Sequence, residues 1–236
     1  MNGRRLLLVS SSVVHGTGYL DHCEEQTLDL FAGAGRVLFV PWALYDRAGY
    51  AATVRERFAA WEREVDSLHD ATDPVAAVRD AQGIFIGGGN TFRLLRELQR
   101  SDVMEAIRQR VADGMPYMGT SAGSNVAGAT IRTTNDMPIV ETAGFDALGL
   151  VPFQINPHYV DPDPDSTHQG ETRDQRLFEF HEENATPVVA IREGAMIEVK
   201  DGETNLRGAT GGKLFLPGRE PRELSGGERL APLLNP

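Results

Sequence analysis

The sequence has little cysteine, no long apolar run and few cations. Cys23 is the single cysteine among 236 residues, so an internal disulfide is impossible, which fits a reducing compartment. The N-terminal segment MNGRRLLLVSSSVV has no convincing signal-peptide cleavage site, and no stretch approaches the length of a membrane span. The formal net charge of −11 disfavours nucleic acid or an anionic membrane as the main partner. We therefore expect a cytoplasmic protein, and an acidic substrate is still compatible with this charge, since one arginine in a pocket can reverse the local field.

Strand-like and helix-like segments alternate along the chain. Apolar runs predict strands at 5–11, 36–43, 83–90, 115–120, 153–160, 187–203 (two strands) and 213–217. Periodic or charged segments predict helices at 20–31, 46–65, 73–81, 91–112 (with a break near Ser101), 124–131 and 170–184. This alternation predicts one α/β domain, residues 1–236, with a mostly parallel central sheet covered by helices on both faces. Three segments, GGGN, GTSAG and INPH, fall at expected strand ends, where sites form in such sheets.

A serine occupies the centre of Gly119–Gly123, GTSAG, which matches G-x-S-x-G. In this motif a sharp strand-to-helix turn exposes the serine hydroxyl, and the flanking glycines remove side chains that would clash. The amide after the serine points toward a developing oxyanion, so Ser121 is a candidate nucleophile and Ala122 a candidate donor. The motif is short, and a tight turn without catalytic function is the alternative interpretation.

A nucleophilic serine needs a base, and the base needs an acceptor that orients it. His158 follows an apolar strand and is the preferred base, with His168 as the second choice. Glu193, between an apolar strand and a glycine, is the preferred acid. A structural histidine and a solvated turn glutamate are the alternatives. The order Ser, His, Glu differs from the Ser, acid, His order of α/β-hydrolases, so a triad here would belong to another fold.

Two further segments have patterns that ligand sites use. The glycine run at 87–90 lacks the P-loop lysine and the G-x-G-x-x-G spacing, so an oxyanion donor near Ser121 fits it better than a phosphate site. Asp161, Asp163 and Asp165 alternate as calcium ligands do, but prolines separate them and the EF-hand glycine and glutamate are missing. No Cys/His cluster indicates zinc. We expect neither a metal nor a cofactor.

Seven blocks in order resemble peptidase E, the family of aspartate-specific dipeptidases: FIGGGNTFRLL, GTSAGSN, IRTTNDMPIV, GFDALGL, QINPH, GETRDQR and REGA. They span about residues 83–195. The resemblance implies a class I glutamine amidotransferase-like (flavodoxin-like) α/β fold with a serine at the nucleophile elbow. It also implies metal-independent hydrolysis of dipeptides, and some tripeptides, that begin with aspartate.

The resemblance assigns roles to individual residues. It implies a catalytic triad and two oxyanion donors: Ser121, His158 and Glu193, and the backbone amides of Gly89 and Ala122. Arg173 of the GETR block would bind the substrate's aspartate side chain, since a guanidinium binds a carboxylate through two parallel hydrogen bonds. Asn90 is a second candidate substrate-binding residue.

The chain departs from the family pattern at the elbow. Thr120 and Ser124 stand where the family commonly has tryptophan and alanine. Thr120 removes a large aromatic side chain beside the elbow serine, so the shape of the pocket and the range of substrates stay open, whereas we expect the elbow geometry to be kept. Two alternatives stay open: the same triad acting on cyanophycin-derived or isoaspartyl peptides, and a non-catalytic binder of acidic small molecules. The GGGNTF and GETR blocks favour the dipeptidase. A homodimer is the commonest arrangement of soluble oligomers, and the residues 132–136 have no predicted role.

Overall fold

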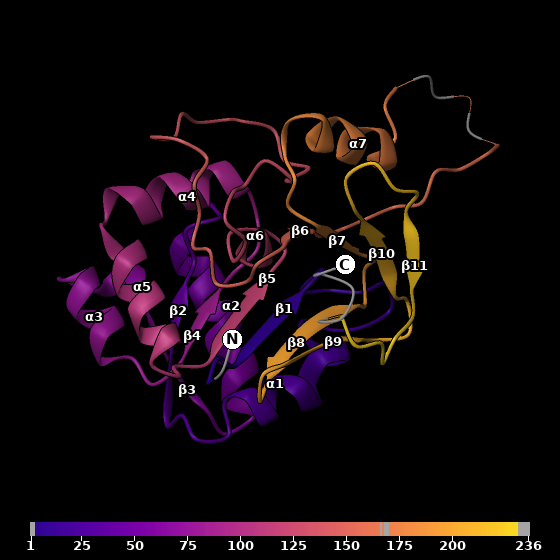
Figure 1. The fold of residues 1–236 in the computed structure, drawn as a ribbon. Coiled ribbons are helices and arrows are strands. Elements are labelled where there is room, and N and C mark those ends of the chain that lie inside the picture. Colours follow the sequence, from indigo (N-terminus) through magenta and orange to yellow (C-terminus); the bar gives the residue numbers. More distant parts are fainter. Residues whose placement is uncertain (1–2, 166, 168–169, 231–236) are drawn as a thin grey trace.

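The computed structural model describes residues 3–165, 167 and 170–230, which form two sheets and their covering helices (Figure 1). The central sheet has seven strands in the order β3 (Glu64–Ser67), β2 (Arg36–Val40), β4 (Ile84–Ile86), β5 (Tyr117–Thr120), β1 (Leu6–Val9), β8 (Met196–Lys200) and β9 (Glu203–Arg207). The first five strands are parallel, and β8 and β9 continue the sheet in antiparallel pairs. The predicted mostly parallel α/β sheet is therefore confirmed.

Helices cover both faces of the central sheet because alternate strand residues point to opposite sides. Leu7, Val9 and Phe39 pack in one core with α1 (Glu24–Leu30) and α2 (Arg47–Ala60), next to the short helix η1 (Asp21–Cys23). Leu6 and Leu8 pack in the other core with α3 (Pro74–Asp80), α4 (Thr91–Arg100) and α5 (Val103–Ala112). Strands β1, β4 and β5 are buried throughout, which explains their continuous apolar runs.

A second sheet, which the sequence analysis did not predict, stands beside the central one. It contains β11 (Arg222–Leu224), β10 (Gly212–Phe215), β7 (Val188–Ile191) and β6 (Gln154–Asn156) in that order. Helix α7 (Arg173–Glu183) lies over it (Figure 1). Leu177 and Phe180 of this helix pack with residues of β7 and β10. The strands predicted at 153–160 and at the start of 187–203 therefore belong to this sheet and not to the central one.

Two other boundaries differ from the prediction, and a third agrees with it. The helix expected over 46–65 ends at Ala60, since Glu62 has a φ of 58°, and the polar strand β3 follows after the short turn. Helix α6 (Ala122–Asn125) is far shorter than the helix expected over 124–131. The predicted break near Ser101 is confirmed: α4 ends at Arg100, and Asp102, with a φ of 53°, precedes α5. Within the described residues, no helix is both long and apolar enough to cross a membrane.

Candidate active site

The predicted elbow is present at the end of β5. Ser121 follows the last residue of this strand directly and precedes α6, with φ 51° and ψ −110°, a conformation that is costly for a residue with a side chain. Its amide donates to the carbonyl of Val9 at 3.0 Å, which anchors the turn to β1. Gly123 packs against β4 so closely that a Cβ there would overlap the carbonyl oxygen of Ile86. Packing therefore requires a glycine at position 123, the second residue after Ser121.

Three predicted side chains meet at this elbow. The Nε2 atom of His158 lies 3.0 Å from Ser121 Oγ, and its Nδ1 atom lies 2.7 Å from Glu193 Oε1. His158 comes just after β6, and Glu193 lies in the turn between β7 and β8. In the tautomer with a proton on Nδ1, the imidazole donates to the carboxylate, and Nε2 is free to accept the serine proton.

His158 is held at its backbone by a serine from the central sheet. Its amide donates to Ser10 Oγ at 2.9 Å, and that hydroxyl in turn donates to the carbonyl of Ile191 at 2.9 Å. Ser10 directly follows β1 and is fully buried. His158 itself has a φ of 53°, so the turn is fixed in an unusual conformation. Ser10 thus joins the two sheets at the site, and sequence reasoning did not find it.

The block at residues 132–136 anchors the segment that leads to His158. The Asn156 amide nitrogen donates to the carbonyl of Thr133 at 2.8 Å and to Asn135 Oδ1 at 3.0 Å. The Asn135 amide nitrogen donates to the carbonyl of Pro157 at 2.8 Å. These asparagines belong to the blocks IRTTNDMPIV and QINPH, but no local pattern in the sequence indicates that they pair.

Two backbone amides near the elbow have no hydrogen-bond acceptor among the described residues. Among the described residues, neither the Gly89 nor the Ala122 amide donates a hydrogen bond, whereas the neighbouring Gly88 amide donates to the Tyr50 hydroxyl at 2.9 Å. Gly89 has a φ of 133°, and a Cβ there would lie 2.7 Å from the Ala43 carbonyl oxygen, so only glycine fits. Both predicted oxyanion donors are therefore available to a ligand.

The side chain of Asn90 is used inside the protein. Its oxygen accepts from the Arg93 amide at 3.0 Å and caps α4, and its nitrogen donates to the Met137 carbonyl at 2.9 Å. Asp136 also contacts the start of this helix, since its carboxylate accepts from the Thr91 amide at 2.7 Å. Asn90 therefore orders the loop beside the glycine run, and its predicted contact with substrate stays a prediction.

Arg173 is the first residue of α7. Thr172 and Gln175 form a capping box that begins the helix. Arg173 is partly buried and lines a cavity of about 430 Å³ that Asn135 and Arg176 also line. Burial, followed by the charge of Arg176, lowers the pKa of Arg173, and Asp136 opposes this. Within the described part of the chain, its guanidinium makes no hydrogen bond or ion pair, so it is available to an anionic ligand.

The arrangement of the elbow residues agrees with the comparison to known families. The model of peptidase family S51 matches residues 6–207. The chain belongs to peptidase family S51. The matched range contains every site residue discussed above, from Ser10 to Glu193. This membership makes the chain a serine peptidase, and the predicted resemblance is confirmed.

Relatives at high identity cover nearly the whole S51 chain. Peptidase E of Streptomyces coelicolor is 49% identical over 230 residues, which is 98% of this chain and 95% of the relative. A Drosophila melanogaster protein named as a probable alpha-aspartyl dipeptidase is 48% identical over 235 residues, with 98% and 95% coverage. The crystal structure of a peptidase from an acI-B1 Actinobacterium superposes with a TM-score of 0.71 over 97% of this chain and 98% of that one, at 20% identity. The names of the relatives support dipeptidase activity, and the superposition supports the fold.

The two departures from the elbow pattern lie inside the S51 fold. Thr120 has a fully buried side chain, so it does not line an open pocket beside the nucleophile. The Ser124 hydroxyl is also buried and donates to the carbonyls of Val9 and Gly119 at 2.7 and 2.8 Å, which ties α6 to two strands.

The other predicted chemistry does not assemble into a site. The carboxylate of Asp161 lies 2.7 Å from Arg192 and 2.9 Å from Lys213, and Asp163 accepts from the Asp165 amide, which disfavours the calcium alternative. In the described ranges, no group of three or more His, Cys, Asp or Glu side chains has an arrangement for a metal ion. Burial raises the pKa of the Cys23 thiol to about 12, so it is a packed side chain. His168, the second choice of base, lies outside the described residues.

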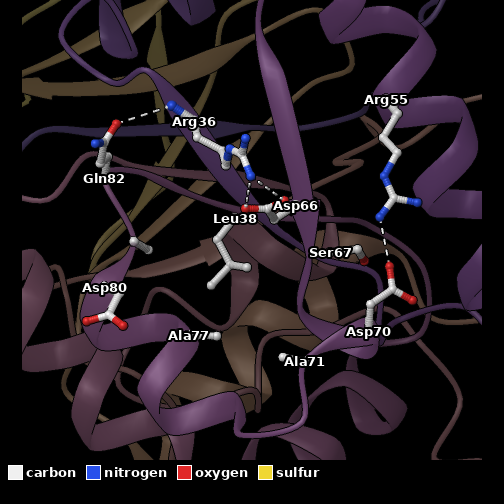
Figure 2. A pocket seen from close by; sticks show the side chains of 11 residues that line it. Arg36, Leu38, Arg55, Asp66, Ser67, Asp70, Ala71, Ala77, Asp80 and Gln82 are labelled. Atoms are coloured by element: carbon white, nitrogen blue, oxygen red, sulfur yellow. Dashed lines mark hydrogen bonds and ion pairs between the residues drawn. The ribbon is translucent and has the colours of Figure 1, made fainter.

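A larger cavity of about 470 Å³ opens elsewhere, beside the edge strand β3 (Figure 2). Four of its five charged side chains pair with one another, Arg36 with Asp66 at 3.2 Å and Arg55 with Asp70 at 2.7 Å, and the fifth is Asp80. None of the triad residues lines it. This cavity is therefore separate from the S51 site.

Proposed function

We propose that this chain is a serine dipeptidase that removes an N-terminal aspartate from dipeptides, and from some tripeptides, through the triad Ser121, His158 and Glu193. The observation that carries the proposal is the continuous chain of contacts, 3.0 Å from Ser121 Oγ to His158 Nε2 and 2.7 Å from His158 Nδ1 to Glu193 Oε1. It stands on a strained strand-to-helix turn, the backbone setting in which a serine is exposed as a nucleophile.

In the proposed acylation step, Ser121 Oγ attacks the carbonyl carbon of the aspartyl residue. His158 Nε2 takes the hydroxyl proton and then gives it to the leaving amine of the second residue. Glu193 stays ionised and stabilises the imidazolium through the Nδ1 hydrogen bond. Water, deprotonated by His158, then attacks the acyl-enzyme, releases aspartate and restores the Ser121 hydroxyl.

The oxyanion of the tetrahedral intermediate would be bound by the amides of Gly89 and Ala122. Both amides lack a protein acceptor among the described residues, and one of them begins α6 directly after the nucleophile. A preorganised amide donor is typically worth about 10²–10³ in kcat. This supports a hydrolytic role over a binder without catalysis.

Aspartate recognition is assigned to Arg173. Its guanidinium lines a cavity and makes no ion pair in the described part of the chain, so a substrate carboxylate would be its partner. A partly buried guanidinium without an anion carries a desolvation cost, and binding of aspartate but not asparagine would offset this cost. The name of the Drosophila relative, an alpha-aspartyl dipeptidase, agrees with this preference.

The proposal is tested by hydrolysis of Asp-Leu, Asn-Leu and Ala-Leu in the presence of EDTA. We expect a much higher kcat/KM for Asp-Leu than for Asn-Leu or Ala-Leu, and a loss of several orders of magnitude in kcat for Ser121→Ala with unchanged folding. Ser101→Ala, at the end of α4, is the matched control and should keep full activity. Equal cleavage of Asp-Leu and Asn-Leu would reject the specificity, and an active Ser121→Ala variant would reject the triad.

Two further properties are proposed with the activity. A cytoplasmic location agrees with a single cysteine that is free and buried. A homodimer is proposed as the assembly, and sedimentation at several protein concentrations would test it.

A further inference from the structure

Three residues of the proposed site each have a chain neighbour in one group of paired side chains. Tyr159 follows His158, Asp174 follows Arg173, and Arg192 precedes Glu193. We call this group, completed by Asp161 and Lys213, the lysine network. It lies where β6, β7 and β10 meet the start of α7. The network therefore has a member in each of the three segments that carry His158, Arg173 and Glu193.

Lys213 is the centre of the lysine network. Its Nζ donates to the Tyr159 hydroxyl at 2.9 Å and lies 2.9 Å from Asp161 Oδ1 and 3.7 Å from Asp174 Oδ2. The Tyr159 hydroxyl donates in turn to Asp174 Oδ1 at 2.5 Å. The side chains of Lys213 and Asp174 are only 19% and 18% exposed, so water screens these contacts weakly. One ammonium thus joins β10, the His158 segment and α7.

A second cation extends the network to the Glu193 turn. Arg192 binds Asp161 with two parallel contacts, Nε to Oδ2 at 2.7 Å and Nη2 to Oδ1 at 2.9 Å. It also pairs with Glu223 on β11. Asp161 is therefore shared by two cations, whereas Lys213 is the one cation of the described network that contacts Asp174.

Asp174 links the first turn of α7 to the second sheet. This carboxylate lies in the first helical turn, one residue after Arg173, and points to Tyr159 and Lys213. Further along, α7 is held by apolar packing of Leu177 and Phe180, which is less directional than a hydrogen-bonded ion pair. The position of the first turn, and of the Arg173 guanidinium, therefore depends on the Asp174 contacts.

We propose that Lys213 is a positioning residue for aspartate recognition: through Tyr159 and Asp174 it fixes the first turn of α7, and so places Arg173 against the substrate carboxylate. The inference rests on the proposed function for the role of Arg173. Without the Lys213 ammonium, no cation lies between Asp161 and Asp174. The Asp174 carboxylate then keeps only the neutral Tyr159 hydroxyl as its donor. The first turn would then shift, while the elbow on β5 would be unaffected.

The test is the kinetics of Lys213→Met with Asp-Leu. We expect KM to rise about tenfold and kcat to change less than about threefold, because ground-state binding of the aspartate is lost and the triad is kept. The preference for Asp-Leu over Asn-Leu should fall in the same variant. Lys213→Arg, which keeps the charge, should restore most of the affinity, and Tyr159→Phe should give an intermediate KM.

Lys200→Met is the matched control. Lys200 also lies on a strand and pairs with a carboxylate, Asp29 at 2.6 Å, but at the end of β8 that is remote from Ser121. Lys200→Met should leave KM for Asp-Leu unchanged. An unchanged KM in Lys213→Met, or an equal loss of kcat/KM for Asp-Leu and Asn-Leu, would overturn the proposal.

Hydrogen exchange separates this inference from the proposed function. The amides of residues 173–177 should exchange faster in Lys213→Met than in the wild type and in Lys200→Met, whether or not any peptide is cleaved. Equal exchange in the three proteins would overturn the positioning role even if Asp-Leu is a substrate. Absence of Asp-Leu cleavage by the wild type would reject the proposed function alone.

Discussion

The proposed nucleophile and its proposed partners are held in two different ways. Ser121 lies on the central sheet, where the strands around it are fully buried and the turn is fixed by backbone hydrogen bonds and close packing. His158, Glu193 and Arg173 belong to the second sheet and α7, where polar and charged side chains fix their positions. A short local motif therefore specifies the first region, whereas contacts between residues far apart in the chain specify the second.

The largest expected effect comes from filling space at the elbow. Gly123→Ala would place a methyl group against the Ile86 carbonyl of β4, and both are backbone positions that cannot move aside. We expect a loss of about 3 kcal/mol or more in the free energy of unfolding, measured by urea denaturation.

Gly33→Ala is the control for this substitution. Gly33 has open space around its Cβ position and an ordinary φ, so alanine should change stability by less than about 0.5 kcal/mol. A Gly123→Ala variant as stable as Gly33→Ala would mean that packing does not define the elbow.

A smaller effect is expected where the two regions join. Ser10→Ala removes the acceptor of the His158 amide and one donor to the Ile191 carbonyl. The His158 amide loses its acceptor, whereas the Ile191 carbonyl keeps the Tyr159 amide as a donor. A lost partner of this kind typically costs about 1–3 kcal/mol, and we expect kcat for Asp-Leu to fall about tenfold as His158 loses its position. Wild-type kcat at reduced stability would show that Ser10 supports the fold but not the histidine.

The second region should weaken first in acid. Hydrogen bonds from Arg192, and then from Lys213, lower the pKa of Asp161 from 3.8 to about 2. Because the folded-state pKa is the lower one, the stabilisation is complete above about pH 4 and disappears as the pH falls toward about 2. The carboxylate is nearly half exposed, so we expect an effect below about 1 kcal/mol. Asp161→Asn should reduce the slope of unfolding free energy against pH in that window, and an identical slope would contradict this account.

The smallest effect is expected at the cavity beside β3 (Figure 2). Arg36 pairs with Glu64 and Asp66, but all three side chains are more than half exposed. Ion pairs of this kind contribute little because water and salt screen them. Arg36→Met should leave both the melting temperature and Asp-Leu hydrolysis unchanged, and a loss of activity would assign a role to this cavity.

Much of the central sheet was predictable because its strands are buried on both faces. The runs RLLLVSS and RVLFVPWA contain β1 and β2, and the glycines after β4 and β5 mark their ends. Strand β3 lies at the sheet edge, and its sequence, EVDS, is polar. We therefore predicted it as the end of the charged helix that precedes it. The second sheet was not predicted because β7 is as apolar as a central strand, and nothing local says which strand it pairs with.

The site was predictable to the extent that local sequence encodes it. Ser121 follows from its motif and its place after a strand, and His158 and Glu193 follow from their strand ends and the family blocks. Ser10 could not be found in this way, since its contact with His158 joins residues 148 positions apart. The same holds for Asn135 and Asn156, whose pairing depends on how two loops meet in space.

The backbone at Ser121 has a thermodynamic consequence for the whole protein. Its φ of 51° and ψ of −110° cost of order 1–3 kcal/mol for any residue with a Cβ, whereas glycine adopts positive φ readily. The Ser121→Gly variant should therefore have no peptidase activity and should melt at a higher temperature than the wild type. Natural selection on stability alone would remove the proposed nucleophile, so under the proposed function the serine persists at this position only through selection for turnover.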